Sequence, residues 1–399
     1  MEIGKPAPPE ELVDREDEIG GIVKKIRTKI NYNIALIGYR RIGKSSILYK
    51  VADILSKDEK ILVVYFDLQK NLGDPKMFLT ALQSAIFNAY AKKFGKLKKI
   101  KAKLGTTNII GKMMETLSSK KIKGISMEIK PGQSPDDFTI KPKIEFEQKE
   151  TSYMEMFSTV FRTANALAEK NKIKVVIILD EFQEITQLRR YRGLKNVLDI
   201  FRGVIQERDK NVSFVICGSH VHTLRSILSE GKSSLFLHFV QVPIGEMDKE
   251  NSILLFNKYL EAKGLRKNNS VAAHAYELVG GQPYYLMALA EAWEPKKDLE
   301  AVFSEILSSS VGSLRLYCEY VLADDLASAQ GGPLLRAIMN ALAGGSLGYS
   351  ELANSLSVPM PELVPYVNEL IKADLIIKEG AKYAVRDRII KEYLKLNAA

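Results

Sequence analysis

Cysteine is nearly absent from this sequence of 399 residues. Only Cys217 and Cys318 occur, so the chain cannot build a disulfide framework or a cysteine-based metal site. This usage fits the reducing environment of the cytoplasm, where we expect the protein to reside. Histidine is also scarce, at four residues. The spacing of the one close pair, His220 and His222, argues against a metal site.

Long hydrophobic runs are missing as well. No stretch of about 18 or more uncharged apolar residues occurs, so we expect no membrane-spanning helix. The first residues, from Met1 to Lys5, lack the basic-then-apolar pattern of a signal peptide. Hydrophobic residues still make up 46% of the chain and charged residues 27%. That composition is sufficient for the cores of two or three globular domains.

The excess positive charge is concentrated in one segment. The chain carries 58 Lys and Arg against 48 Asp and Glu, a net charge of +10. Residues 92–130 (Lys92 to Lys130) contain twelve Lys, no Arg, and Glu115 and Glu128 as their acids, so they account for the whole excess. Blocks of like charge are usually solvated, and a solvated insertion is our first interpretation. Binding of nucleic-acid phosphates or of an acidic membrane surface is the alternative.

Four short apolar runs, separated by helical patterns, predict an α/β core. They cover residues 33–37, 61–67, 174–180 and 212–217. Such runs are too short for helices and are typical of strands buried on both faces of a parallel sheet. We therefore predict a doubly wound α/β domain over residues 1–245, interrupted by a lysine-rich insertion at 92–150 that stays outside the sheet.

From residue 246 onward the sequence predicts helices. Residues 246–328 show a helical pattern that is broken at Gly280–Pro283. A Gly- and Pro-containing linker follows near residue 330. Beyond it, residues 329–399 contain three short helical stretches and a hairpin, which is the order of a winged helix-turn-helix.

The strongest motif is a complete phosphate-binding loop. Residues 38–45 match GxxxxGK[ST] between a predicted strand and a predicted helix, where backbone N–H groups and the helix N-terminus can hold phosphates. Lys44 would reach the β and γ phosphates, and the Ser45 hydroxyl would hold Mg²⁺. The predicted nucleotide contacts of this loop are Gly38, Tyr39, Arg40, Arg41, Ile42, Gly43, Lys44, Ser45 and Ser46.

Polar side chains follow the third and fourth predicted strands. Asp180 can coordinate Mg²⁺, and Glu181 can orient and deprotonate a water that attacks the γ-phosphate. Ser219 can hydrogen-bond the γ-phosphate or that water, with helix capping as the alternative role. We therefore predict Lys44, Glu181 and Ser219 as catalytic residues. Ser45 and Asp180 are the predicted metal ligands.

Together these motifs resemble the predominantly archaeal P-loop ATPases of the STAND group, which are AAA+-related and similar to origin-recognition initiators. The resemblance rests on residues 13–18, 38–46, 179–183, 218–219, 280–283 and 383–387. It implies an α/β ATPase core with a helical lid and a C-terminal winged helix. It also implies that the stretch around Arg15 approaches the adenine and ribose, that Pro283 covers the base, and that Ser219 is the first sensor.

One stretch departs from the family pattern. A Leu-Tyr-Gly-Arg-like sequence usually follows the sensor strand, and this chain has Leu235-Phe236-Leu237-His238. The resemblance therefore implies slow hydrolysis and leaves the arginine that reads nucleotide state open, with Arg202 and Arg225 as candidates.

The sequence as a whole predicts a Mg²⁺-dependent ATPase that acts as a nucleotide-gated molecular switch, with ATP or ADP as its ligand. One alternative is an initiator-like ATPase that binds nucleic acid through the basic insertion or the winged helix. Another is a nucleotide-bound scaffold that does not hydrolyse ATP. The second helix of the predicted helix-turn-helix, residues 360–372, has two Glu against one Lys. That charge balance is unfavourable for binding DNA. We therefore favour packing or protein docking as its role.

Overall fold

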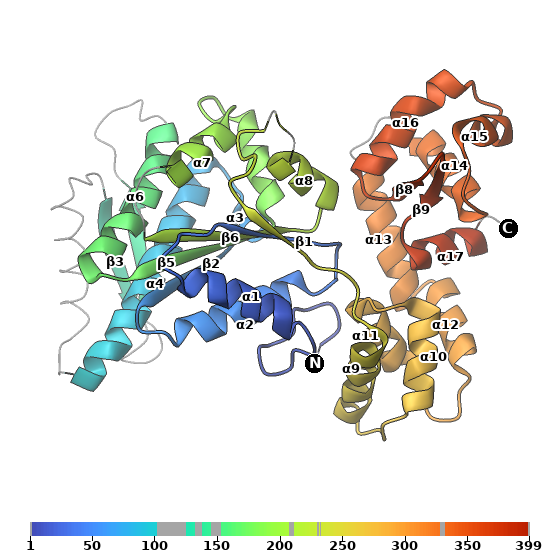
Figure 1. Cartoon of the computed structure of the whole chain (residues 1–399), viewed down its shortest axis with the longest axis horizontal. Helices are drawn as coiled ribbons and strands as arrows, with labels where there is room; N and C mark the ends of the chain where they lie inside the picture. Colours follow the sequence, from blue (N-terminus) through green and yellow to red (C-terminus); the bar gives the residue numbers. More distant parts are fainter. Residues whose placement is uncertain are drawn as a thin grey trace.

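The computed structural model describes residues 2–101, 125–131, 138–144, 153–206, 211–229, 231, 233–327 and 332–397. Figure 1 shows a layered α/β half and, beside it, a C-terminal half that is mainly helical. Within the described residues, no helix combines the length and the apolar character needed to cross a membrane.

A five-stranded sheet forms the α/β half. Its strands are β1 (Ile34–Ile37), β2 (Ile61–Asp67), β5 (Lys174–Asp180), β6 (Val212–Gly218) and β7 (Val240–Pro243). They lie in the order β2-β5-β6-β1-β7, and every neighbouring pair is parallel. The predicted parallel α/β fold is therefore confirmed. The sequence patterns do not reveal β7, because its four residues, two of them exposed and two partly exposed, end in proline and form no apolar run.

Helices cover both faces of this sheet (Figure 1). One face packs against α1 (Glu16–Arg27) and α2 (Lys44–Ser56). The other face packs against α4 (Pro75–Lys101), α6 (Tyr153–Asn171), α7 (Val197–Gln206) and α8 (Val221–Ser229). Because side chains alternate along a strand and both faces are covered, the strands are apolar at nearly every position, as the sequence indicates.

The lysine-rich segment lies partly outside the described residues. Helix α4 runs without a break to Lys101, past residue 92, where we expect the insertion to begin. Strands β3 (Ile125–Pro131) and β4 (Phe138–Ile144) pair antiparallel in a sheet of their own. Residues 102–124, which hold much of the charge, are not described.

The C-terminal half contains two sets of elements. The lid helices are α9 (Lys249–Ala262), α10 (Asn269–Val279), α11 (Pro283–Ala292), α12 (Leu299–Ser308) and α13 (Ser313–Ala327). The winged unit, residues 332–397, comprises α14 (Gly332–Ala343), α15 (Tyr349–Leu356), α16 (Met360–Lys372), β8 (Ile376–Glu379), β9 (Lys382–Val385) and α17 (Arg388–Asn397). One hydrophobic cluster includes residues of both sets, from Met247 to Leu394. Packing therefore continues across the domain boundary expected near residue 328, which stays a prediction, as does the winged-helix assignment.

Candidate functional site

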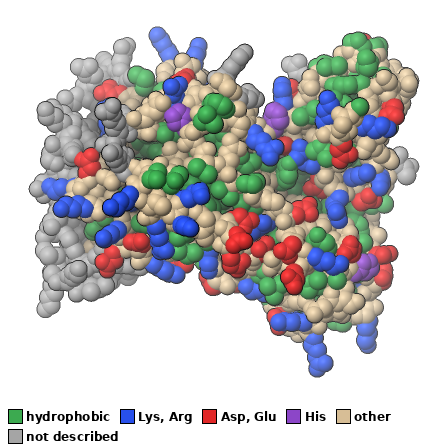
Figure 2. Space-filling model, in the orientation of Figure 1, with side chains coloured by type: hydrophobic (Ala, Val, Ile, Leu, Met, Phe, Trp, Pro, Cys, Tyr) green, Lys and Arg blue, Asp and Glu red, His purple; other side chains and the backbone are tan. Residues whose placement is uncertain are grey.

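A cavity of about 410 Å³ opens at the carboxyl ends of the strands, between the sheet and the lid helices. Its walls come from the N-terminal segment, the phosphate loop, the ends of β5 and β6, and helices α9, α11 and α13. All the predicted site residues line it except Gly38 and Tyr39. Figure 2 shows acidic side chains gathered beside the junction of the two halves. The cavity therefore has the size and the position of a ligand site in an α/β fold.

Gly38 and Tyr39 take other positions in the loop. A Cβ atom on Gly38 would lie 2.5 Å from the carbonyl oxygen of Ile244, so only glycine lets the loop pass this strand end. The Tyr39 ring faces the winged unit, with the Arg386 guanidinium 4.7 Å from its centroid. At the other end of the loop, Gly43 has φ 98°, a backbone angle that favours glycine, and α2 then begins at Lys44.

The Lys44 ammonium is buried at the start of α2. The residue is 5% exposed, and its Nζ donates a hydrogen bond of 2.7 Å to the carbonyl of Tyr39. Burial lowers the pKa of Lys44, and the nearby acidic side chains, Glu181 and Asp180 among them, act in the opposite sense. A buried cation at a helix N-terminus is suited to an anionic ligand.

Asp180 is held by groups from two neighbouring strands. Its Oδ2 accepts a short hydrogen bond from the Tyr65 hydroxyl on β2. Its Oδ1 accepts from the Cys217 thiol on β6 at 2.6 Å and from the backbone N–H of Glu181 at 3.0 Å. Burial raises the pKa of Cys217, so the thiol remains a neutral donor. The sequence motifs do not point to Tyr65 and Cys217. Both become neighbours of Asp180 through the strand order, which the motifs do not reveal.

Glu181 directs one carboxylate oxygen into a cluster of donors. Its Oε2 accepts from the backbone N–H of Ser219 at 3.0 Å, from the Ser219 hydroxyl at 2.9 Å, and from Gln183 Nε2 at 2.7 Å. Strands β5 and β6 are neighbours, and their carboxyl ends bring Glu181 and Ser219 together. The Ser219 hydroxyl, expected to face the γ-phosphate or the attacking water, thus contacts the predicted base. In the sequence, Gln183 stands out only as the last residue of the stretch 179–183 that resembles the family.

Two arginines of the phosphate loop, Arg40 and Arg41, lie at the cavity. Arg40 Nη2 lies 2.7 Å from Nε2 of His220, the residue that follows Ser219 in the chain. Both side chains line the cavity. Arg202 and Arg225, the two candidates from the sequence, are exposed and do not line it. His238 is also absent from the lining. Of Arg40, Arg202 and Arg225, Arg40 is the one whose side chain lines the cavity.

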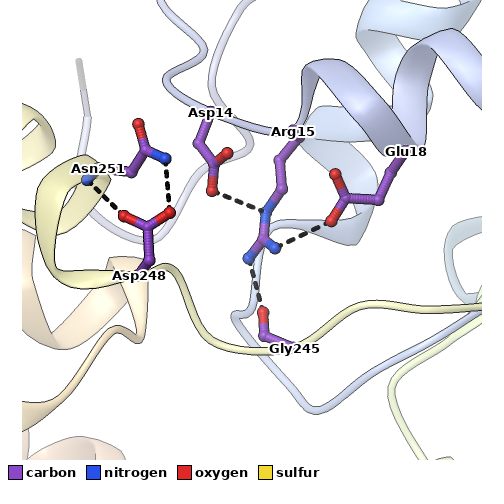
Figure 3. A network of polar contacts seen from close by, with 6 residues as sticks. All are labelled: Asp14, Arg15, Glu18, Gly245, Asp248 and Asn251. Carbon is purple, nitrogen blue, oxygen red and sulfur yellow. Dashed lines mark hydrogen bonds and ion pairs between the residues drawn. The ribbon is translucent and has the colours of Figure 1, made fainter.

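Arg15 lies at the cavity, but its guanidinium binds protein groups (Figure 3). It is 5% exposed and donates to the carbonyl of Gly245 at 2.6 Å and to Glu18 Oε1 at 3.2 Å, with Asp14 Oδ2 at 3.9 Å. Asp248, nearby in Figure 3, caps α9. Arg15 thus ties the start of α1 to the segment that leads into the lid helices. Pro283 opens α11 at the cavity wall.

The phosphate loop also contacts the lid helices directly. The Arg41 guanidinium lies 4.1 Å from the ring centroid of Tyr284 on α11 and 5.3 Å from that of Tyr317 on α13. Gln282 Nε2, just before α11, donates to the carbonyl of Arg40 at 3.0 Å. The Arg40 guanidinium lies 5.7 Å from the ring centroid of Tyr320.

The winged unit reaches the α/β half at a second point. Asp374 Oδ2, after α16, accepts from the backbone N–H of His222 at 2.6 Å, at the start of α8. Arg386 Nη2 lies 3.6 Å from Asp374 Oδ1. Arg386 therefore bridges this contact and the Tyr39 ring. The winged unit thereby touches both the phosphate loop and the segment that follows Ser219.

Comparisons with known proteins agree with this arrangement. Residues 12–289 match a family of ATPase domains that come predominantly from Archaea. No curated protein sequence matches the chain. A Walker-type ATPase of Pyrococcus abyssi has a similar structure, with a TM-score of 0.69 and 20% identity over 98% of this chain and 99% of that one. The ORC2 protein of Aeropyrum pernix, solved in ADPNP-ADP complexes, has a TM-score of 0.53 and 12% identity over 99% and 97% of the two chains.

Proposed function

The chain belongs to the family of ATPase domains found predominantly in Archaea, and from this membership we propose that it uses ATP binding and hydrolysis to switch between two arrangements of its halves. One observation carries the proposal. Three consecutive phosphate-loop side chains, Tyr39, Arg40 and Arg41, each contact a ring or a guanidinium of the C-terminal half. A nucleotide that changes the conformation of this loop would change those contacts.

In this proposal the phosphates lie against the loop and Lys44. The buried ammonium can exchange the Tyr39 carbonyl for a phosphate oxygen, which is a stronger acceptor because it is charged. The adenine lies toward the N-terminal segment around Arg15 and toward Pro283, which line the same cavity. Apolar cavity residues beside Pro283, among them Leu255 and Met287, suit the face of a purine ring.

Ser45 and Asp180 fit a magnesium ion. Both side chains line the same cavity and offer oxygen atoms, the donors that Mg²⁺ prefers. Within the described residues no group of three or more His, Cys, Asp or Glu could hold a metal. That agrees with an ion bound through one or two protein oxygens and completed by phosphates and waters. When bound, Mg²⁺ would neutralise charge on the β and γ phosphates.

Glu181 is the proposed general base. Its Oε2 is occupied by three donors, so Oε1 is the oxygen that accepts a proton from water. The water oxygen bonds to the γ-phosphorus, the bond from that phosphorus to the β–γ bridging oxygen breaks, and ADP leaves with the electron pair. Arg40, beside His220, is a second cation of the loop, after Lys44, that can stabilise the charge on the γ-phosphate.

Hydrolysis would be transmitted through the phosphate loop. A ligand shifts an equilibrium only by its difference in affinity for the two states. ATP and ADP differ by the γ-phosphate, and Arg40 of the loop contacts His220, the residue that follows Ser219. Loss of the γ-phosphate would release Arg40, and with it the contacts that Arg40 and Arg41 make with α11 and α13.

A spin-label distance measurement tests the switch. Lys57 and Lys395 are exposed, in the α/β half and the winged unit, and can be replaced by cysteine. The native Cys217 and Cys318 are buried, so labelling stays selective. We expect different distance distributions in the ADP state and in the ATP state trapped by Glu181→Gln. Identical distributions in the two states would refute the switch and leave the ATPase assignment untouched.

A matched pair of substitutions tests the contact itself. Arg386→Met removes the stacking on Tyr39, whereas Lys382→Met changes the same hairpin at a residue paired with Glu351 on α15. Without nucleotide, Arg386→Met should broaden the distribution of distances between the two spin labels, and Lys382→Met should leave it unchanged. Equal behaviour of the two variants would argue against the Arg386 contact as part of the switch.

The exposed face of α16 supports protein docking over DNA binding. Its exposed side chains include Met360, Val364, Glu362 and Glu369, and Lys372 is its one basic residue. A helix that enters a DNA groove needs positive and amide side chains on that face. We therefore propose a docking role for the winged unit, with a protein as the partner.

A further inference from the structure

Gln183 lies directly behind the proposed base. The residue is 6% exposed, on the 3-10 helix η1 (Phe182–Arg190) that follows β5. Its Nε2 donates to Glu181 Oε2 at 2.7 Å and approaches Glu184 Oε1 at 3.4 Å. Because carboxylates accept hydrogen bonds, the amide nitrogen must face them and the amide oxygen must point away. This fixes the orientation of the Gln183 amide.

The orientation leaves the other end of the amide in an unfavourable place. Within the described part of the chain, Gln183 Oε1 is buried and has no hydrogen-bond partner. A buried acceptor of this kind is costly, and native proteins contain few of them. The hydrogen bonds of the amide nitrogen thus outweigh the cost of keeping the amide oxygen buried without a partner.

Gly218 makes room for this amide. A Cβ atom on Gly218 would lie 2.1 Å from Gln183 Oε1 and 3.2 Å from its Cδ, which no real contact allows. The backbone of Gly218 has no positive φ, so backbone conformation does not require glycine there. Gln183 is therefore the nearest residue that a side chain at position 218 would clash with. The missing side chain at Gly218 thus leaves space for the Gln183 amide that donates to Glu181.

We propose that Gln183 is a positioning residue for ATP hydrolysis, which holds Glu181 Oε2 so that Oε1 faces the attacking water. The inference rests on the proposed role of Glu181 as base. The Ser219 backbone and hydroxyl fix the same oxygen from the β6 side, and Gln183 fixes it from the η1 side. Without Gln183, the carboxylate keeps only the two donors of Ser219 among the described residues and is held from the β6 side alone, so Oε1 is aimed less firmly. Gln183 also lines the cavity, and in this scheme its amide nitrogen acts on Glu181 and not on the nucleotide.

The test replaces Gln183 in the full chain and measures turnover separately from binding. Gln183→Leu keeps the volume and removes the donor. We expect kcat to fall about 10-fold or more, since small misplacements of catalytic groups are costly. The KM for ATP and the Kd for ADP should change by less than about twofold, because the donor acts on the base and not on the nucleotide. An unchanged kcat overturns the proposal.

Gln187→Leu is the matched control. Gln187 lies one turn further along η1, is exposed, and donates to Glu184, and no hydrogen bond links it to Glu181 in the described residues. Its replacement should leave kcat unchanged. If both substitutions lower kcat equally, the effect belongs to η1 as a whole and the positioning role of Gln183 is wrong.

A double-mutant cycle separates positioning from structural support. In the Glu181→Gln background, Gln183→Leu should cause little further loss of kcat, because the group that it positions is gone. Additive losses would overturn the proposal. Full turnover of Glu181→Gln alone would instead refute the base assignment under the proposed function, so the two failures are distinguishable.

Gly218 supplies a second route that does not depend on how Gln183→Leu folds. Gly218→Ala should lower both the melting temperature and kcat, because the new Cβ displaces the amide. Adding Gln183→Ala removes the clash, so the double variant should regain melting temperature and not kcat. Recovery of both, or a Gly218→Ala protein that behaves like the parent, would contradict the arrangement.

Discussion

Removal of the Lys44 charge should separate nucleotide binding from stability. Lys44→Met keeps most of the apolar stem and removes the ammonium, which is buried and bonded to the Tyr39 carbonyl at 2.7 Å. Two effects on the free protein oppose each other. The costly burial of a charge is relieved, and the Tyr39 carbonyl loses a donor, each worth roughly 1–3 kcal/mol. We expect the melting temperature of the free protein to change by no more than about 2–4 °C.

The effect on ATP binding has no such compensation. A hydrogen bond between a charged group and its partner contributes about 1.5–3 kcal/mol, which corresponds to a loss of roughly 10- to 150-fold in affinity. ADP should lose less, because Lys44 reaches both the β and γ phosphates and ADP lacks the second. The lowered pKa of Lys44 adds a pH effect. As pH rises toward that pKa the ammonium is lost, so ATP affinity should fall at alkaline pH in the parent and not in the variant.

Calorimetric titration with ATP and ADP, together with thermal denaturation of the free protein, checks this reasoning. The expected pattern is a nearly unchanged melting temperature, a large loss of ATP affinity and a smaller loss of ADP affinity. An unchanged ATP affinity in Lys44→Met would refute the phosphate-loop assignment. Equal losses for ATP and ADP would place the ammonium at the β-phosphate alone.

Three further predictions concern the chemistry, the arginine and the insertion. Glu181→Gln should retain ATP binding while single-turnover phosphate release slows by roughly 10²-fold or more, the usual contribution of a general base; parent-like release would move the base elsewhere. Arg40→Lys, which keeps charge but loses the planar fork, should lower kcat by about 10-fold or more, whereas Arg202→Ala and Arg225→Ala should match the parent in the same assay. Replacement of residues 102–124 by a Gly/Ser linker leaves α4 intact and removes five Lys, at 103, 112, 120, 121 and 123. If those lysines bind duplex DNA, the parent should show a log–log salt slope of about −4 to −5 that the deletion abolishes with ATPase activity kept; equal DNA retention by both proteins would support a solvated insertion.

Local patterns in the sequence determined the elements of the site. The loop from Gly38 to Ser45 and the strand that ends at Asp180 and Glu181 are contiguous, and their chemistry depends on neighbours within a few residues. The same holds for the buried strands, whose continuous apolar runs follow from helices on both faces. β7 shows the limit of this approach, since an edge strand of four half-exposed residues has no pattern of its own.

Only the tertiary structure decided which groups hold these elements in place. The strand order sets β6 between β1 and β5, and so brings Cys217 to Asp180 and Ser219 to Glu181. Contacts between residues far apart in the chain depend on how strands are ordered and how helices pack, and spacing within the sequence carries no record of either. For the same reason the sequence offered Arg202 and Arg225 as nucleotide-sensing candidates, and only the fold shows that neither lines the cavity. It likewise could not reveal that a Cβ atom at Gly218 would meet the Gln183 amide, 35 residues earlier in the chain.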